Sequence, residues 1–367
     1  MKRILVFGMT ENPGGVESFL ITYYRNIDRE KIQFDFLCNS HNPVAYEEEL
    51  ISLGGRTYHF TARSKNPGLY KKELNHLFKE HSSEWSAIWV NVSSLANIDY
   101  LKIAKEYGIQ KRIIHSHNSR NMDNKLRGVL HEWNKRSLQK WATDFWACSE
   151  DAAKWFYKDE LLSKTVIIHN AIDMGRISYN ADKRRAIRNK LRIGENTYVI
   201  GNVGRLHFQK NQAFAIDVFR EYLKMNPDSR LILIGQGEDG DRLRERASDL
   251  GEKVLFTGVQ SDIQGWLSAF DLFLFPSLFE GLSISAMEAQ GNGIPVLASE
   301  GVIPHEVKIA PNFIFFSLDQ TAEKWAKMIS QIKTGYKRCE EAEIQKAFIK
   351  KGFDISTEAQ RLEGMLV

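Results

Sequence analysis

Short apolar runs alternate with helix-patterned segments along the chain. In the first half the runs are RILVFG, FDFLC, SAIWVNV, KRIIHSH and FWACSE, and VESFLITYYRNI between the first two has the spacing of an amphipathic helix. Runs rich in β-branched and aromatic residues are typical of buried strands, and their alternation with helices indicates βαβ units. We therefore predict an α/β protein whose parallel sheets carry helices on both faces.

The alternation pauses once and then resumes. TVIIHNAID ends the first series, a charged segment at residues 182–192 follows, and YVIGNVGRL opens a second series that continues with RLILIGQG, KVLFTG, DLFLFPS and IPVLAS. We predict two Rossmann-like domains, at residues 1–174 and 175–350, with a C-terminal helix at 351–367 packing back on the first domain. Such folds bind ligands beyond the carboxyl ends of their strands, so we expect a site in a cleft between the domains.

Composition excludes several classes of protein. With 367 residues, 43% hydrophobic and 26% charged, the chain is an ordinary globular protein rather than a disordered or fibrous one. The three cysteines are far apart in the sequence, which argues against a disulfide framework or a zinc site. The apolar run after Lys2 and Arg3 ends at Gly8, so it indicates a first strand rather than a signal peptide. We expect a cytoplasmic protein.

The positive charge is concentrated in the first half of the sequence. Residues 1–180 hold 25 basic and 21 acidic side chains, whereas residues 181–367 hold 25 of each. Within the first half, residues 102–140 hold ten basic and three acidic side chains. This segment is a candidate anion-facing surface.

One helix predicted in the basic segment has two interpretations. Its apolar positions have helical spacing and predict a stripe that faces the core. Its basic positions then form a solvated face, or alternatively a face that lies on an anionic membrane, which would make the protein peripheral on the inner face of the cell membrane. The apolar positions are Leu126, Val129, Leu130, Trp133 and Trp141, and the basic positions are Lys125, Lys135, Arg136 and Lys140.

Two loops that follow predicted strands carry candidate anion-binding groups. Gly14 and Gly15 precede the predicted helix at 16–26, where paired glycines allow close approach of a ligand to free helix N–H groups, or form a plain turn. In GNVGRLHFQKN, Arg205 and Lys210 follow a strand, and Asn211 is placed to cap the next helix. Two cations at a strand end can bind a diphosphate, although single surface charges are commonly only solvated.

The segment PSLFEGLSISAMEAQGNGIPVLAS has the most informative pattern. A strand ends at Pro276, a loop follows, and a helix is predicted from about Leu282 to Gln290, with Glu280 just before it and Glu288 two turns inside. A helix N-terminus can hold a phosphate, while carboxylates beside it accept hydrogen bonds from hydroxyls. The pattern therefore predicts a site for a phosphate joined to a polyhydroxylated group. The backbone N–H groups at this helix start belong to Gly281, Leu282 and Ser283.

These residues resemble a known family. The E-x7-E of Glu280 and Glu288, the GNVGRL...QKN element and the N-terminal GGVE resemble retaining nucleotide-sugar glycosyltransferases of the GT-B fold, glycosyltransferase family 4, and in particular bacterial enzymes of capsular and exopolysaccharide biosynthesis. The second half carries the more specific motifs. The resemblance implies a GT-B fold of two Rossmann-like domains with the donor cleft between them.

The resemblance also implies roles for individual residues. Arg205 and Lys210 neutralise the donor diphosphate, Glu288 holds the ribose hydroxyls, and Glu280 holds hydroxyls of the transferred sugar beside the backbone of residues 281–282. On this basis Arg205, Lys210 and Glu280 are expected catalytic residues.

Three further implied roles complete the expected site. Gly15, with Gly14, lets the N-terminal loop close over the phosphates. His117 matches the position of a catalytic histidine beside the transferred sugar, with His115 as the weaker alternative and a structural role as the common fate of such a residue. The nucleotide base is expected to contact residues 258–262, starting at Gly258.

Two other patterns have ordinary structural explanations. GQGEDG fits a dinucleotide-binding fingerprint, but the next predicted strand ends without the acidic residue that the fingerprint requires, so we interpret it as a turn into a helix. Asp239 and Asp241 resemble a metal-binding D-x-D, but acidic residues are also favoured at a helix start. We expect no metal and no other cofactor.

The function expected from the resemblance is retaining, metal-independent hexosyl transfer from a nucleotide diphosphate sugar, with UDP as the expected nucleotide. The expected acceptor is a glycan or a polyprenyl-diphosphate-linked saccharide of surface polysaccharide biosynthesis. One alternative is a non-hydrolysing sugar-nucleotide 2-epimerase of the same fold. The alternative from another class is a non-catalytic basic protein that binds nucleic acid or a membrane surface; for the enzyme we expect no nucleic-acid partner.

Overall fold

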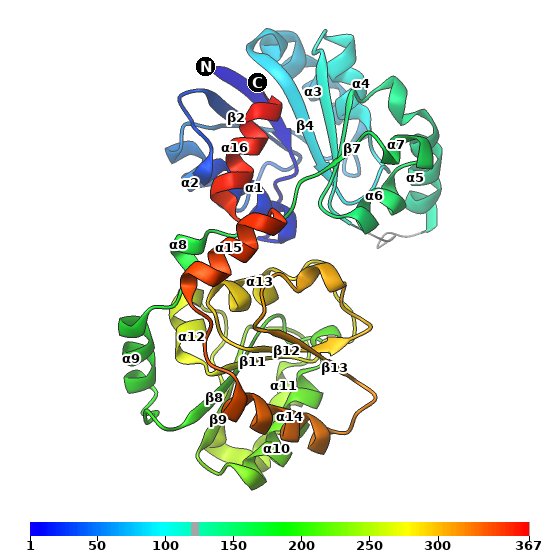
Figure 1. Cartoon of the computed structure of the whole chain (residues 1–367). Helices are drawn as coiled ribbons and strands as arrows, with labels where there is room; N and C mark the ends of the chain where they lie inside the picture. Colours follow the sequence, from blue (N-terminus) through cyan, green and yellow to red (C-terminus); the bar gives the residue numbers. More distant parts are fainter. Residues whose placement is uncertain (119–124, 367) are drawn as a thin grey trace. The chain divides into compact units, whose positions relative to one another are not determined.

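The computed structural model describes residues 1–118 and 125–366 and divides the chain into two units (Figure 1). The first unit is Met1–Ala171 together with Ile355–Val367, and the second is Ile172–Asp354. Counted over the sequence, the first unit holds 25 basic and 22 acidic side chains and the second 25 and 24. The positive excess therefore differs less between the units than between the sequence halves, because the C-terminal segment adds acidic residues to the first unit.

The described part of the first unit contains a parallel sheet in the order β3-β2-β1-β4-β5-β6-β7. Its strands are β1 (Lys2–Phe7), β2 (Ile32–Cys38), β3 (Arg56–His59), β4 (Trp85–Val92), β5 (Lys111–Ser116), β6 (Asp144–Ala147) and β7 (Thr165–Ile167). Its helices are α1 (Gly15–Asn26), α2 (Glu47–Ser52), α3 (Pro67–His81), α4 (Asp99–Glu106), α5 (Lys125–Ser137), α6 (Glu150–Phe156), α7 (Asp159–Leu162) and α16 (Ile355–Leu366), with 3-10 turns Ser82–Glu84 and Leu138–Lys140.

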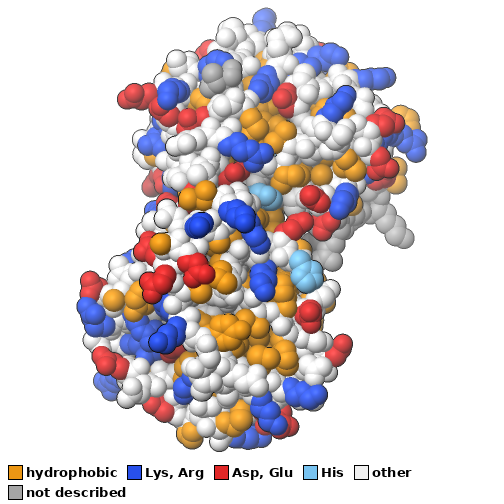
Figure 2. Space-filling view, viewed as in Figure 1, with side chains coloured by type: hydrophobic (Ala, Val, Ile, Leu, Met, Phe, Trp, Pro, Cys, Tyr) orange, Lys and Arg blue, Asp and Glu red, His pale blue; other side chains and the backbone are white. Residues whose placement is uncertain are grey.

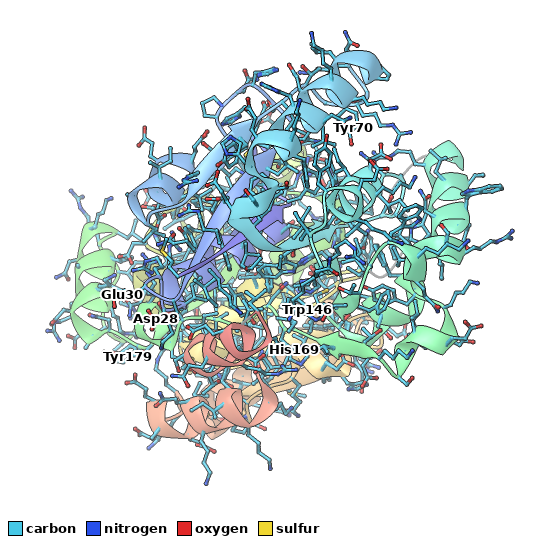
Figure 3. All side chains as sticks on the ribbon, turned by 90° about the horizontal axis from the view of Figure 1, so that it is seen from above. Asp28, Glu30, Tyr70, Trp146, His169 and Tyr179 are labelled. Carbon is cyan, nitrogen blue, oxygen red and sulfur yellow. The ribbon has the colours of Figure 1, made fainter. Side chains whose placement is uncertain are left out.

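Alternation along β1 fills a core on each side of this sheet. Ile4 and Val6 face a core that includes α1 and α16, whereas Leu5 faces a core that includes α3, α4 and α6. Tyr70 of α3, labelled in Figure 3, belongs to the second core. Successive residues of a strand point to opposite faces, so one apolar run serves both cores.

The C-terminal helix α16 packs beside α1 (Figure 1). Asp28, labelled in Figure 3, donates its backbone N–H to the Glu363 carboxylate (2.7 Å), and the Lys111 ammonium donates to the Met365 carbonyl. The last helix of the chain therefore completes the core of the unit that contains the first strand.

The described second unit has a parallel sheet in the order β10-β9-β8-β11-β12-β13. Its strands are β8 (Tyr198–Val203), β9 (Ser229–Ile234), β10 (Val254–Phe256), β11 (Leu272–Phe275), β12 (Val296–Glu300) and β13 (Phe313–Ser317). Its helices are α8 (Met174–Ile177), α9 (Ala181–Lys190), α10 (Gln212–Met225), α11 (Gly240–Arg246), α12 (Ile263–Ala269), α13 (Ile284–Gly291), α14 (Ala322–Gly335) and α15 (Glu341–Lys351), with 3-10 turns Phe208–Lys210, Ser248–Lys253 and His305–Val307.

Helices cover both faces of the second sheet as well. One core includes residues of α8, α12, α13 and α15, and the other includes residues of α10, α11 and α14. The predicted α/β class with two Rossmann-like parallel sheets is therefore confirmed. The edge strands β3 and β13, which our strand prediction did not include, complete the two sheets.

The basic segment differs from the prediction in one important respect. Trp141 packs against the core, but Val129, Leu130 and Trp133 of the predicted core stripe are exposed by 66%, 37% and 71%. The prediction was wrong because α5 is attached through polar residues, as described below. The side chain of Leu126 is outside the described residues.

The basic residues of the same segment have varied environments. Arg112 is buried and donates to the carbonyl groups of Ile109, Gln110 and Trp141. Arg120 and Asp123 lie outside the described residues. On the face shown in Figure 2, blue Lys and Arg side chains and red Asp and Glu side chains are interspersed. None of the described helices is long and apolar enough to cross a membrane.

Candidate functional site

The candidate site of the second unit lies at the carboxyl ends of β8 and β11. These two strands are neighbours at the centre of the sheet, and the strand order changes direction between them. In open parallel sheets this switch point is where loops diverge and ligands bind. The loop after β8 carries Arg205 and Lys210, and the loop after β11 carries Glu280. The fold thus brings the two predicted motifs to one edge of the sheet.

Hydrogen bonds tie these two loops together. The Leu278 N–H donates to the Gln209 carbonyl (2.8 Å), and the Gln209 side chain donates to the Phe279 carbonyl (3.0 Å). Asn211 occupies the N-cap position of α10 but has φ +53°, and its side chain does not cap the helix. It donates instead to the Pro276 carbonyl (3.1 Å), which corrects the predicted capping role. Asn211 therefore helps to hold the loop that carries Glu280.

Lys210 and Glu280 form an ion pair inside this loop structure. The Lys210 Nζ lies 2.7 Å from the Glu280 Oε1, and the two side chains are only 16% and 6% exposed. Screening by water is weak for such a pair, and removal of one partner leaves an uncompensated charge. The pair holds a cation and an acceptor carboxylate side by side, which suits a ligand with a phosphate next to hydroxyl groups.

Arg205 has a different partner from Lys210. Its guanidinium pairs with the Glu238 carboxylate (3.1 and 3.3 Å), and its side chain is 68% exposed. The His207 Nε2 lies 3.3 Å from the same carboxylate. The two predicted phosphate-binding cations therefore belong to separate ion pairs, one buried and one in solvent. Sequence reasoning missed Glu238, which lies in the turn that we had interpreted as structural.

The glycines of that turn have a packing role. A Cβ on Gly235, which has φ +136°, would lie 2.0 Å from the Gly204 carbonyl oxygen, and one on Gly237 would lie 2.3 Å from the Leu206 carbonyl oxygen. Only glycine allows this close approach of the turn to the loop after β8. The predicted base-contacting residue Gly258, with φ +70°, follows β10, and its carbonyl accepts a hydrogen bond from the Gly235 N–H (2.9 Å).

The helix after Glu280 begins later than expected. α13 starts at Ile284, with Ser283 as its N-cap, and the Ser283 hydroxyl pairs with the Ser285 hydroxyl (3.2 Å) rather than capping the helix. Gly281 is exposed with open space around its Cα, Leu282 is half-buried and Ser283 is buried. The first N–H groups of a helix have no partner within it, so this loop presents donors beside Glu280.

Glu288 is the second carboxylate of the E-x7-E pair. It lies in α13, and burial raises its pKa to about 7. No side-chain hydrogen bond or ion pair joins it to another residue in the described parts of the chain, 1–118 and 125–366. Its charged form therefore lacks compensation, and hydroxyl donors from a ligand would stabilise that form.

In the first unit, Gly14 and Gly15 lie at the start of α1. Gly14 is the N-cap residue, and nothing lies within 4 Å of a Cβ placed on Gly15. The first turn also contains the buried Glu17, whose carboxylate accepts a hydrogen bond from the Thr10 hydroxyl (2.6 Å). An acidic side chain thus already lies at this helix N-terminus, and closure of the loop over a phosphate stays a prediction.

His117 follows β5 and has a defined hydrogen-bond partner. Its Nε2 lies 2.9 Å from the Asn91 Oδ1, and the Asn91 amide nitrogen donates to the Phe7 carbonyl (3.2 Å). Because the Asn91 oxygen can only accept, the Nε2 of His117 carries the hydrogen and Nδ1 is left as an acceptor. Burial lowers the pKa of His117 to about 3, so the ring is neutral and suited to accepting a hydroxyl hydrogen bond.

His115, the weaker alternative, lies inside the core. It is fully buried and stacks on Trp89, with a centroid distance of 5.9 Å. Burial lowers its pKa well below the usual value. The environment of His115 is that of a neutral core residue, whereas His117 is partly exposed.

Comparison with known proteins gives the family. Residues 183–352 match the model of the family described as "Glycosyl transferases group 1". The chain is 30% identical over 344 residues to EpsF of Bacillus subtilis (strain 168), a protein named as a glycosyltransferase, with 90% of this chain and 87% of EpsF covered. It is 25% identical to the Escherichia coli "UDP-Gal:alpha-D-GlcNAc-diphosphoundecaprenol alpha-1,3-galactosyltransferase", over 78% of this chain and 76% of that enzyme.

Solved structures have the same fold. A glycosyltransferase from Rickettsia africae ESF-5 superimposes with a TM-score of 0.79 at 16% identity, covering 100% of this chain and 97% of that one. HepE from Anabaena, in complex with UDP, superimposes with a TM-score of 0.76 at 19% identity, covering 100% and 99%. With its two Rossmann-like units and this extended similarity, the chain belongs to the glycosyl transferases of group 1 and has the GT-B fold.

Proposed function

We propose that this glycosyltransferase moves a hexosyl group from a UDP-sugar to a polyprenyl-diphosphate-linked saccharide, with retention of configuration and without a metal. The observation that carries the proposal is the buried Lys210–Glu280 pair between the β8 and β11 loops. The helix that follows Glu280, α13, carries Glu288 one turn after its start, and no side-chain partner of Glu288 is found among the described residues. A cation, a helix N-terminus and two carboxylates in one place suit a diphosphate flanked by a sugar and a ribose. The choice of UDP and of the acceptor follows the donor and acceptor in the name of the Escherichia coli relative.

In the proposed complex, Lys210 and Glu280 bind different parts of the nucleotide-sugar donor. The Lys210 ammonium has three donors, so it can bind a phosphate oxygen while it keeps its bond to Glu280. The free acceptor capacity of the Glu280 carboxylate then holds sugar hydroxyls. Positive charge fixed in a protected site stabilises the negative charge that develops on the departing diphosphate, which is commonly the largest catalytic contribution.

The remaining proposed contacts with the nucleotide sugar come from Glu288 and His117. The loss of solvent around Glu288 is offset when the ribose hydroxyls donate to its carboxylate. The neutral His117 accepts from a hydroxyl of the transferred sugar through Nδ1. Attack on the same face as the departing phosphate, with that phosphate taking the acceptor proton, retains configuration without a covalent intermediate.

The test has a binding stage and a transfer stage. Thermal unfolding of the full chain is measured with a panel of nucleotide sugars; the proposed donor at about 100 times its Kd should add about 2.7 kcal/mol of stability. The best donor is then supplied with a polyprenyl-diphosphate saccharide, and the anomeric configuration of the product is determined by NMR. Transfer with retention that is unaffected by EDTA is expected.

Three outcomes contradict the proposal. An inverted product excludes the retaining mechanism, and loss of activity with EDTA that a divalent cation restores excludes metal independence. Release of an epimerised nucleotide sugar in the absence of any acceptor identifies a 2-epimerase instead.

A further inference from the structure

Helix α5 is attached to the first unit through polar side chains. The Leu95 N–H donates to the Nδ1 of the buried His131 (3.0 Å), and Asn134 donates to the Leu95 carbonyl (2.7 Å). Lys135 donates to the Trp155 carbonyl (2.8 Å), and the His131 ring stacks on the Trp155 ring at 4.4 Å. These bonds fix the rotation of α5 about its axis with the polar face inward.

The other face of α5 therefore presents apolar side chains to solvent. Val129 and Trp133, one turn apart, are 66% and 71% exposed, and Leu130 between them is 37% exposed. A hollow lined by both Val129 and Trp133 extends toward Trp155 of α6, and Figure 1 shows α5 beside α6 at the edge of this unit. Contiguous exposed apolar side chains on a soluble protein mark an interaction surface.

Basic side chains border this apolar patch. Arg136, exposed, lies one turn after Trp133, and Arg127 is also exposed, whereas Glu132 is the single acidic residue in the described part of α5. Tryptophan and aliphatic side chains bordered by cations are the composition of elements that bind at the interface of anionic bilayers.

We propose that Val129, Leu130 and Trp133 enter the headgroup layer of an anionic membrane, with Arg127 and Arg136 beside the lipid phosphates. The apolar face of α5 is then the inserting element, rather than a core stripe beneath a basic face. A second copy of the chain is a poorer occupant, because a symmetric contact through this patch would bring the arginines of both copies together. The purpose of this docking, access to a lipid-linked acceptor, rests on the proposed function.

The experiment measures vesicle binding by the full chain without donor or acceptor. Co-sedimentation is compared for vesicles of phosphatidylcholine alone and of equal parts phosphatidylcholine and phosphatidylglycerol. The double variant Val129→Ser/Trp133→Ser should bind the anionic vesicles at least about tenfold more weakly. Arg136→Ala should weaken binding to the anionic vesicles by about fivefold. The matched control Ile51→Ser removes another exposed apolar side chain of the same unit, 53% exposed, and should leave binding unchanged.

Several results would overturn this inference. Binding of the double variant equal to that of the wild type excludes insertion of α5, as does equal weakening by Ile51→Ser. A wild-type dimer that becomes a monomer in the double variant, with no vesicle binding by either, shows that a second copy covers the patch. Transfer to a short-chain, water-soluble acceptor should be unchanged in the double variant. If the wild type binds vesicles but transfers no sugar, the proposed function is contradicted, while membrane binding by α5 is still supported.

Discussion

The two units place different chemistry on similar parallel sheets. In both, the strand order changes direction at the first strand of the unit, between β1 and β4 and between β8 and β11. At the second switch point, charged side chains pair with each other, as in Lys210–Glu280. At the carboxyl edge of the first sheet, the corresponding groups form hydrogen bonds with neutral side chains instead. His117 bonds to Asn91, and Glu17 accepts from the Thr10 hydroxyl.

Under the proposed function, this difference gives the two units different roles. The second unit holds the groups suited to a diphosphate, and the first presents a neutral hydrogen-bonding residue and an exposed basic and apolar helix. Parallel sheets supply the same edge in each case, and the loops decide its chemistry. Substitutions at six residues test whether the difference holds.

The largest effect is expected at the buried ion pair. Lys210→Ala and Glu280→Gln should each lower kcat by about 10²–10³-fold, because the departing diphosphate loses a fixed cation or the sugar loses its acceptor. Steady-state transfer kinetics measure the loss, and circular dichroism checks the fold. Lys327→Ala, which breaks an exposed lysine–glutamate pair of the same unit, is the control and should have normal turnover. Normal turnover in Lys210→Ala or Glu280→Gln would contradict the assignment of this ion pair to the active site.

A smaller effect is expected in the first unit. His117→Ala should reduce kcat by roughly 10–100-fold, since one positioned neutral acceptor is lost while the diphosphate contacts remain. The activity of the wild type should not titrate with this group above pH 5, because burial keeps the pKa of His117 at about 3. The control His76→Ala changes an exposed histidine of α3. If both variants have the same turnover, the first unit contributes no contact of this kind.

Glu288 should make donor binding depend on pH. Ribose hydroxyls need the ionised carboxylate, and burial raises its pKa to about 7, so the UDP affinity of the wild type should rise about tenfold from pH 6 to pH 8. Glu288→Gln should bind with one affinity across this range, as measured by calorimetry. A wild type without this dependence would contradict the assignment of Glu288 to the ribose.

The same carboxylate should also affect stability. Its pKa is raised in the folded protein, so the folded state binds more protons than the unfolded state between about pH 4.5 and 7, and stability falls as pH rises through that window. Glu288→Gln should remove this fall and gain on the order of 1–2 kcal/mol above pH 7, measured by urea unfolding.

The smallest effect is expected at the exposed pair. Arg205 is well solvated and already paired with Glu238, so Arg205→Ala should weaken UDP binding by only about three- to tenfold. Glu238→Gln should leave affinity equal or slightly higher, because it releases Arg205 for the phosphate. If Arg205→Ala lowers kcat as much as Lys210→Ala does, the difference in burial between the two cations does not set their contributions to transfer.

Much of this structure followed from local patterns. The strands predicted from apolar runs form the two sheets, and the residues of the β8 and β11 loops lie together because both motifs follow adjacent central strands. The two short edge strands β3 and β13 were not predicted. β3 reads RTYH and has no apolar run, whereas β13 reads FIFFS, an apolar run that the prediction left out.

The orientation of α5 shows the limit of such patterns. Leu126, Val129, Leu130 and Trp133 have the spacing of a core stripe, but spacing alone does not say which face of a helix is inward. The Nδ1 of His131 and the side chains of Asn134 and Lys135 form hydrogen bonds with the backbone of residues 95 and 155, which offset part of the cost of turning this polar face inward. A polar face with matched partners could therefore become the inner one.

The sequence by itself determined the α/β class, the two series of strands and the motifs from which the family could be recognised, because these depend on the order and spacing of residues along the chain. Only the tertiary structure decided that Lys210 pairs with Glu280 and Arg205 with Glu238, that Asn211 ties two loops, and that the apolar face of α5 is exposed. The physical reason is that pairing and burial depend on distances between residues far apart in the sequence, and those distances exist only once the chain has folded.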